Sequence, residues 1–118
     1  MTEKSEIGKC GEELACRHLK SNGYSVIARN FSCRSGEIDI IASKGNTLAF
    51  VEVKTRSRTD MGLPCQAVNC AKQKKIKKTA AFFLLYAPQL SQLQPRFDIA
   101  EVLFSGGKIF IRHLENAF

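Results

Sequence analysis

The sequence contains no apolar run long enough to cross a membrane. The longest run, residues 80–85, is followed by Tyr86 and Ala87 and is far shorter than the ~20 residues that span a bilayer. The N-terminal residues Met-Thr-Glu-Lys-Ser-Glu are too polar for a signal peptide. We therefore expect a cytoplasmic protein without a membrane partner.

The cysteine patterns of zinc sites and of disulfide frameworks are also missing. The chain has five cysteines, an odd number, and none of them forms a C-x-x-C pair. We expect free thiols that behave as small apolar residues in a reducing compartment: Cys10, Cys16, Cys33, Cys65 and Cys70. The two histidines, His18 and His113, stand alone in the sequence, and we assign neither a catalytic role.

Acidic residues are outnumbered by basic ones, and aromatic residues are scarce. The 18 Lys and Arg exceed the 11 Asp and Glu, and the resulting net charge of +7 favours binding of a polyanion such as nucleic acid. Aromatic residues make up only 8%, so a stacking surface for single strands is not expected, which favours duplex or branched substrates. With 44% hydrophobic content, residues 1–118 are expected to form a single globular domain.

Periodicity and turn signals predict two helices and five strands. Apolar residues at three- and four-residue spacing indicate helices over residues 3–21 and 66–86. Short apolar runs bounded by turn residues indicate strands over residues 24–29, 38–43, 48–54, 96–104 and 108–113. The second helix lies between strands, so we expect it to be a crossover in a mixed sheet with helices on its faces.

Three charged residues lie inside the hairpin predicted for residues 36–57. Asp39, Glu52 and Lys54 interrupt strands ("IDII" and "LAFVEV") that are otherwise apolar on nearly every residue, as expected for strands covered on both faces. Residues two apart in a strand share a face, so Glu52 and Lys54 point the same way. A two-residue hairpin loop places Asp39 diagonal to Glu52, and a four-residue loop places the two directly opposite each other. Both registers gather the three side chains on one face.

Two neighbouring carboxylates repel each other unless a cation lies between them. Mg²⁺ takes oxygen ligands, uses one or two carboxylates and accepts substrate phosphate oxygens. Lys54 beside such an ion could orient or deprotonate a water, which suits hydrolysis of a phosphodiester. The alternative is structural: Glu52 and Lys54 form an exposed ion pair at a sheet edge, and Asp39 caps a turn. The apolar neighbours on both strands argue against it.

The order Asp39, turn, Glu52-Val53-Lys54 resembles the D…E-x-K signature of the PD-(D/E)XK nuclease superfamily, which includes restriction endonucleases and archaeal Holliday junction resolvases. Across nearly the whole chain, the motifs "GEELACRHLKSNGY", "RNF", "GEIDIIA", "FVEVKTR", "RFDIAEV" and "HLENAF" are similar to the YraN-like bacterial family. The resemblance implies an α/β fold, the three-layer α/β/α restriction endonuclease-like fold with a central mixed sheet.

The resemblance also implies roles for four residues. Asp39 and Glu52 would bind Mg²⁺ (or Mn²⁺), and Lys54 would be the catalytic lysine. Glu12, in the first helix, would be a further catalytic carboxylate, because resolvase-like members place a helix-borne carboxylate near the metal. The alternative for Glu12 is a solvated helix residue. The residue before Asp39 is Ile38 and not proline, a common variation in the superfamily.

Basic residues flank the D…E-x-K motif on both sides. The segment "KQKKIKK", residues 72–78, places five lysines around a helix and leaves Ile76 to the core. We expect weakly sequence-specific, salt-sensitive binding to nucleic acid, with DNA implied by the resemblance, from these residues: Arg29, Arg34, Arg56, Arg58, Lys72, Lys74, Lys75 and Lys78. The alternative is a solubilising helix face.

Three functional hypotheses follow. The first is a metal-dependent endonuclease acting on duplex or branched DNA. The second is a non-catalytic nucleic-acid-binding module with a nuclease-like fold, and the third is a structural protein whose charges form a salt-bridge cluster. One compact site cuts one strand per visit, so junction or double-strand cleavage would require a homodimer. The apolar residues 80–87 are a candidate dimer surface if they are not part of the core.

Overall fold

The computed structural model describes residues 3–57 and 68–118, and the side chains from residue 8 onward within those ranges. Its elements occur in the predicted order α-β-β-β-α-β-β, with one added 3-10 turn, η2. Their bounds are α1 (Glu3–Ser21), β1 (Ser25–Cys33), β2 (Gly36–Lys44), β3 (Thr47–Arg56), α2 (Cys70–Tyr86), η2 (Pro88–Leu90), β4 (Gln94–Ser105) and β5 (Lys108–Leu114).

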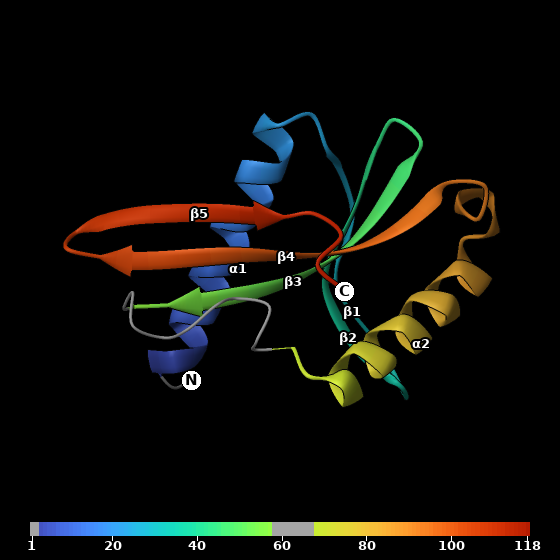
Figure 1. Cartoon of the computed structure of the whole chain (residues 1–118), viewed down its shortest axis with the longest axis horizontal. Coiled ribbons are helices and arrows are strands. Elements are labelled where there is room, and N and C mark those ends of the chain that lie inside the picture. The colour runs from blue at the N-terminus through green and yellow to red at the C-terminus, as the bar shows by residue number, and fades with distance from the viewer. Residues whose placement is uncertain (1–2, 58–67) are drawn as a thin grey trace.

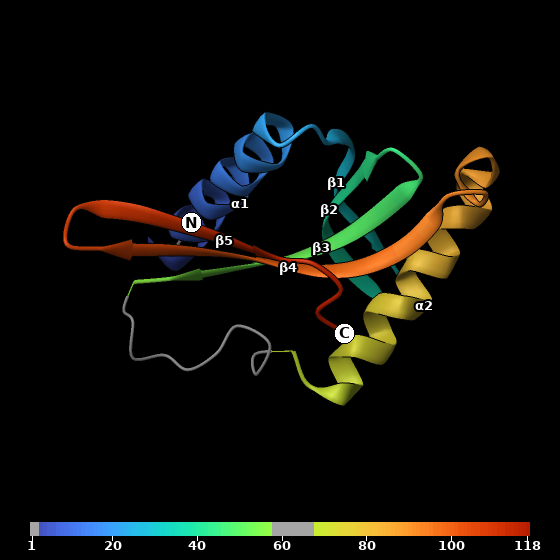
Figure 2. The same ribbon diagram turned by 45° about the horizontal axis from the view of Figure 1, so that its top comes forward.

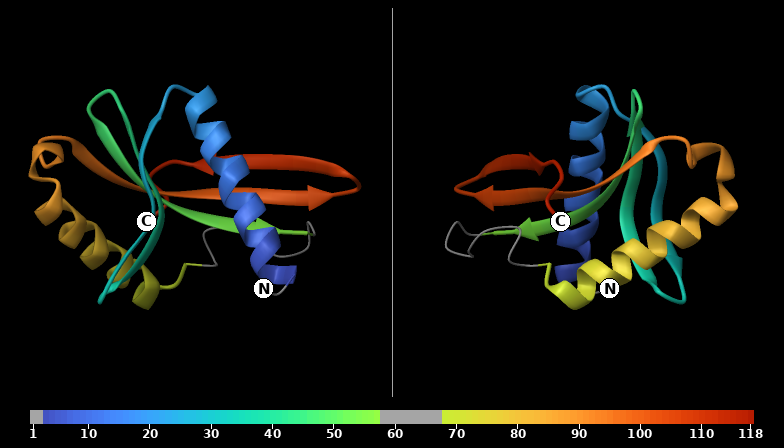
Figure 3. Two further views of the ribbon diagram at one scale, coloured as in Figure 1. Left: turned by 180° about the vertical axis from the view of Figure 1, so that it is seen from behind. Right: turned by 45° about the vertical axis from the view of Figure 1, so that its right-hand side comes forward.

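The five strands form one mixed sheet in the order β1-β2-β3-β4-β5. β3 and β4 are parallel, and the other neighbouring pairs are antiparallel. The connection between β3 and β4 contains α2, which is the predicted crossover. α1 and α2 lie on opposite faces of the sheet (Figures 1 and 3). The chain therefore has the expected α/β/α restriction endonuclease-like architecture. None of its described helices is both long and apolar enough for a membrane span.

Each face of the sheet carries its own apolar core. Leu19 of α1 packs with Ile40 and Val51 on one face, and the fully buried Phe50 packs with Phe83 of α2 on the other. Because both faces are covered, the central strands are apolar on nearly every residue, as the sequence predicts. Among the described residues, the buried strand positions that depart from this pattern are charged, and they include Glu52.

The β2–β3 hairpin has the register that sets Asp39 level with Glu52. Lys44 pairs with Thr47 across a two-residue turn, and pairing continues to Ile40 and Val51. Of the two predicted loops, the two-residue loop has the observed length and the four-residue loop has the observed register, because the turn lies at Gly45 and Asn46 and not at Lys44 and Gly45. Gly45 makes the tighter turn possible because it adopts φ of 58°, which favours glycine.

Most predicted boundaries lie within two residues of those observed, and two differ by more. β1 continues to Cys33 instead of ending at Arg29, because Phe31 pairs with Ile38 and extends the apolar contact between β1 and β2. The described part of α2 begins at Cys70, and the Asn69 side chain caps it by accepting a hydrogen bond of 2.9 Å from the Lys72 amide. The earlier start predicted at Gln66 lies outside the described residues.

The β4–β5 hairpin extends away from α2, so neither of the two described α-helices covers part of the sheet face on the α2 side (Figures 1 and 2). Two large apolar residues of β5, Ile109 and Phe110, are each 50% exposed. The predicted dimer segment, residues 80–87, divides between core and surface. Ala80, Phe83 and Ala87 are buried, and the exposed large apolar side chains of the segment are Phe82, Leu85 and Tyr86.

Candidate functional site

The site forms where β2 parts from β3. Ile38 packs on the α2 face and Ile40 on the α1 face, although residues two apart in a regular strand share a face. The alternation therefore breaks at Asp39. The neighbouring strand is irregular at the same level, because Asn30 adopts φ of 52°. Since β2–β3 pairing ends at Ile40, Asp39 lies at the fork between the two strands.

The Asp39 carboxylate takes the place of a strand partner at this fork. Its Oδ2 accepts a hydrogen bond of 2.7 Å from the backbone amide of Val53. Because β2 no longer pairs with β3 at this level, the bond provides the Val53 amide with an acceptor. It also fixes the carboxylate beside β3.

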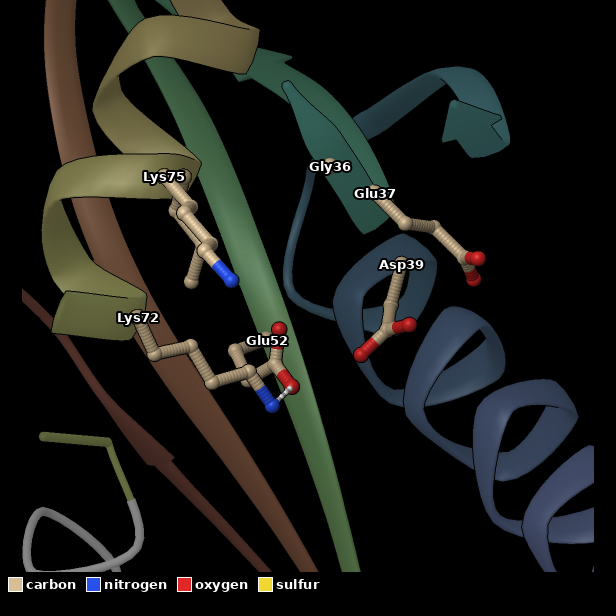
Figure 4. A pocket seen from close by; sticks show the side chains of 7 residues that line it. Gly36, Glu37, Asp39, Glu52, Lys72 and Lys75 are labelled. Atoms are coloured by element: carbon tan, nitrogen blue, oxygen red, sulfur yellow. Dashed lines mark ion pairs between the residues drawn. The ribbon is translucent and has the colours of Figure 1, made fainter. Parts of the chain in front are cut away.

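Glu52 and two lysines face the same space from β3 and α2. Glu52 is 8% exposed, and its Oε1 lies 2.8 Å from Lys72 Nζ and 3.7 Å from Lys54 Nζ. Figure 4 shows Asp39, Glu52 and Lys72 converging from three different elements. They border a pocket of about 270 Å³ whose lining is Gly36, Glu37, Asp39, Glu52, Lys72, Lys75 and Ile76.

The electrostatics of the pocket are dominated by two close carboxylates. Burial, and then the negative charge of Glu52, raise the pKa of Asp39 to about 7, against which the hydrogen bond from Val53 acts. Burial and the neighbouring Lys72 ammonium lower the pKa of Lys54. Burial also acts to lower the pKa of Lys72, but its contact with Glu52 outweighs burial and the net shift is upward. The pKa values of the two lysines are therefore shifted in opposite directions.

Glu12 approaches the pocket from α1. Gly11, one residue earlier, allows α1 to lie close to β3, because a Cβ there would fall 2.0 Å from Thr55 Oγ1. Glu12 is half-buried, and its charge contributes to the raised pKa of Asp39. Within residues 3–57 and 68–118, however, no three His, Cys, Asp or Glu side chains are grouped closely enough to hold a metal. A direct role for Glu12 stays a prediction.

The donor set of the pocket fits a hard divalent cation. Two carboxylates are the usual protein contribution to a Mg²⁺ site, and the remaining positions take water or phosphate oxygens. The raised pKa of Asp39 is consistent with this, because burial and then the charge of Glu52 both disfavour its ionised form in the absence of a cation. Of the two described lysines paired with Glu52, Lys72 is the closer, at 2.8 Å against 3.7 Å for Lys54, and a bound cation would have to displace its ammonium.

The structure brings only some of the predicted nucleic-acid-binding residues to this site. Lys72 and Lys75 line the pocket, and Arg56 lies further along β3. Arg29 is on the α1 face, where its Nη1 donates to Glu13 Oε2 at 2.9 Å. The remaining residues are scattered or undescribed: Lys74 and Lys78 are exposed on α2, Arg34 is exposed between β1 and β2, and Arg58 lies outside the described residues.

Two charged clusters of β4 are absent from the sequence predictions. In the first, Glu101 is 6% exposed and pairs with Arg56 at 3.3 Å and with Arg112 at 2.6 Å. In the second, the fully buried Asp98 lies between Arg96 and His113. The signal was present in "RFDIAEV", where charges interrupt an apolar strand as they do in the hairpin.

The Asp98 cluster joins β4 to β5 and to the C-terminal segment. Asp98 Oδ1 accepts from Arg96 Nε and from the Asn116 amide, both at 2.9 Å. Its Oδ2 lies 2.8 Å from Arg96 Nη2 and 2.7 Å from His113 Nε2. Burial acts to raise the pKa of Asp98, but these hydrogen bonds outweigh it and the pKa falls below its usual value. His113 therefore has a structural partner, as the sequence suggests for a lone histidine.

Comparison with known proteins identifies the family. The family profile described as "Uncharacterised protein family UPF0102" matches residues 11–102. A UPF0102 protein of Caldanaerobacter subterraneus subsp. tengcongensis is 42% identical over 98% of this chain and 96% of its own. UPF0102 proteins of Geobacter metallireducens and Caldicellulosiruptor bescii are each 45% identical, over 95% and 86% of this chain and 91% and 85% of their own lengths. The YraN-like assignment is therefore confirmed, and the chain belongs to the UPF0102 family.

Proposed function

We propose that the protein is a metal-dependent nuclease that hydrolyses phosphodiester bonds in duplex or branched DNA. One observation carries the proposal: the half-buried Asp39 and the buried Glu52 converge on a pocket with Lys54 beside Glu52, and burial, followed by the charge of Glu52, raises the pKa of Asp39 to about 7. A purely structural cluster would pair these charges more completely.

A divalent cation held by Asp39 and Glu52 would stabilise negative charge on the phosphodiester and acidify a nearby water. The two lysines then divide the proton transfers. Lys54, whose pKa is lowered, is suited to accept a proton from the attacking water. Lys72 would be displaced from Glu52 by the cation, and its ammonium is then suited to neutralise the leaving oxygen as the bond from phosphorus to that oxygen breaks.

The charge distribution of α2 supports an anionic substrate. The first turn of α2 has no acidic residue and the last turn has no basic residue. Lys72, Lys74 and Lys75 instead lie near the N-terminal end, where the helix dipole is already positive. This placement costs helix stability, and it makes that end of α2 attractive to phosphate.

A second candidate function is a nucleic-acid-binding module without cleavage. The observation in its favour is the Lys72–Glu52 ion pair, in which an ammonium occupies the position where a metal would otherwise neutralise Glu52. If this pair persists when nucleic acid binds, no cation enters, and the pocket only binds phosphate.

The proposal is tested with the pure protein and labelled duplex, branched and single-stranded DNA, in Mg²⁺, Mn²⁺ or EDTA. We expect cutting only with a divalent cation, and a loss of about a hundredfold or more in Asp39→Asn and in Glu52→Gln, with DNA binding retained. Glu13→Gln is the matched control, because Glu13 is an α1 carboxylate paired with Arg29 away from the pocket. Binding without cutting under every metal condition would favour the second candidate.

A further inference from the structure

The Glu101 cluster lies on the open part of the sheet, directly beside the candidate site. Lys54 is level with Glu101 across β3 and β4, and Glu101 is level with Arg112 across β4 and β5. The three residues therefore form a row across neighbouring strands, which are about 4.8 Å apart. The ion pairs between Glu101 and Arg112 and between Lys54 and Glu52 place the row on the α2 side of the sheet.

Within this cluster the two arginines have different environments. Arg56 is 10% exposed and Glu101 is 6% exposed, so these two form a buried pair whose charges cancel. Arg112 is 58% exposed and contributes a charge beyond that pair. Glu101 thus has its countercharge in Arg56, and the positive charge of Arg112 is left facing solvent.

Arg112 is also held in position. Its Nε and Nη2 donate to Glu101 Oε1 at 3.2 and 2.6 Å, and among the described residues Glu101 is its only hydrogen-bond partner. An arginine has five N–H donors in a planar fork, so most of them remain available on the exposed side of the group. A guanidinium fixed in this way loses less side-chain entropy on binding than a free surface lysine.

We propose that Arg112, positioned by the buried Glu101–Arg56 pair, binds a second phosphate of the same nucleic-acid strand, next to the phosphate that occupies the pocket. The proposal rests on the proposed function and extends it, because it directs the strand from the pocket past Lys54 and across β4 to β5. Neither Glu101 nor Arg112 belongs to the D…E-x-K motif or to the basic segments of the sequence.

The experiment measures binding and not cleavage, so it separates this proposal from the nuclease proposal. Labelled duplex and branched DNA are titrated with protein in EDTA over a range of NaCl concentrations. For Arg112→Gln we expect roughly three- to tenfold weaker binding and a salt slope less steep by about 0.9, the value for one lost phosphate contact. Arg17→Gln is the matched control: Arg17 is an exposed arginine paired with Glu13, but it lies on α1.

Glu101→Gln separates positioning from simple charge. This change raises the net charge by one, so a protein that binds DNA only through overall charge would bind more tightly. We expect weaker binding, because Arg112 is released from its fixed orientation. Circular dichroism of each variant shows whether the fold is preserved. Arg112→Lys keeps the charge and removes the guanidinium fork, so it separates the effect of charge from that of the fork.

Each outcome decides the question. An unchanged affinity and salt slope in Arg112→Gln, a loss of the same size in Arg17→Gln, tighter binding by Glu101→Gln, or no DNA binding by the wild-type protein would overturn the proposal. If Arg112→Gln behaves as expected but no cation supports cutting, the phosphate contact stands and the nuclease proposal fails.

Discussion

Two aspartates of the same sheet, the half-buried Asp39 and the fully buried Asp98, have pKa shifts in opposite directions. Asp98 accepts hydrogen bonds on both oxygens from Arg96, His113 and the Asn116 amide, and its pKa is lowered. Asp39 has one backbone donor, from Val53, and a neighbouring carboxylate, and its pKa rises to about 7. Burial acts to raise the pKa of both carboxyl groups, so the opposite direction of the net shifts comes from their partners. An aspartate whose charge is neutralised by its partners stabilises the fold, whereas one whose charge is not neutralised indicates a binding site for a cation.

The same substitution at both positions should have opposite effects on stability. Asp98→Asn removes the countercharge of Arg96, which is only 20% exposed, and should lower the free energy of unfolding by about 3 kcal/mol. Asp39→Asn keeps an oxygen to accept from Val53 but removes the repulsion by Glu52, so it should raise the stability of the metal-free protein above pH 7. Urea unfolding in EDTA measures both, with Glu13→Gln as a control that should change little. Destabilisation by both aspartate substitutions would remove the distinction drawn here between the two sites.

The pH dependence sharpens the same contrast. The pKa of Asp39 is raised from 3.8 to about 7, so the folded metal-free protein binds a proton more tightly than the unfolded chain. Its contribution to stability is complete below about pH 4 and disappears as the pH rises through 7, a change of about 2 kcal/mol once the access of water to the pocket is allowed for. Asp98 has a lowered pKa and works in the other direction, because its stabilisation is lost only on acidification below 3.8.

In EDTA, the free energy of unfolding of the wild-type protein should therefore decline from pH 4 to pH 8, and that of Asp39→Asn should not show this decline. Saturating Mg²⁺ should also suppress this decline, because a bound cation favours the ionised carboxylate. A wild-type profile that is flat over this range, or that declines equally in Asp39→Asn, would contradict the assignment.

The smallest expected effect concerns Lys72. Its ammonium lies 2.8 Å from Glu52 and competes with a divalent cation for that carboxylate. Lys72→Met should therefore bind Mn²⁺ about tenfold more tightly in calorimetry at a pH well above 7, although it removes a positive charge that cleavage would use. Lys74→Met is the matched control, because Lys74 is an exposed lysine of the same helix that does not line the pocket. Weaker or equal Mn²⁺ binding by Lys72→Met would show that the ion pair does not oppose the cation.

Sequence reasoning reached most of the fold because its signals are local. The helical stripe of α1, the turn residues and the doubly covered strands all depend on neighbours in the chain, and the predicted order of elements is confirmed. The same reasoning limited the hairpin to two registers that gather Asp39 and Glu52 on one face, and the structure has the one that sets them level. The break of strand alternation at Asp39 could not be predicted, because it depends on the pairing of β1 with β2.

What the sequence could not supply was the partner of each charge. Asp39, Glu52 and Lys54 stood out as charges in apolar strands, but Arg96 and Asp98 carry the same signal and belong to a structural network. The two cases differ only through contacts between distant segments. Lys72 reaches Glu52 from α2, and Arg96 reaches Tyr24, which is 72 positions away in the sequence.

The hydrogen bond from Val53 to Asp39 connects the pocket to the backbone of β3. At the fork this amide binds a side chain in place of a second strand, so its electronic environment depends on the charge that the carboxylate carries. Protonation of Asp39, or capture of an ion by it, is thereby transmitted to a peptide group in the middle of the sheet. The amide proton of Val53 therefore reports spectroscopically whether the pocket is occupied.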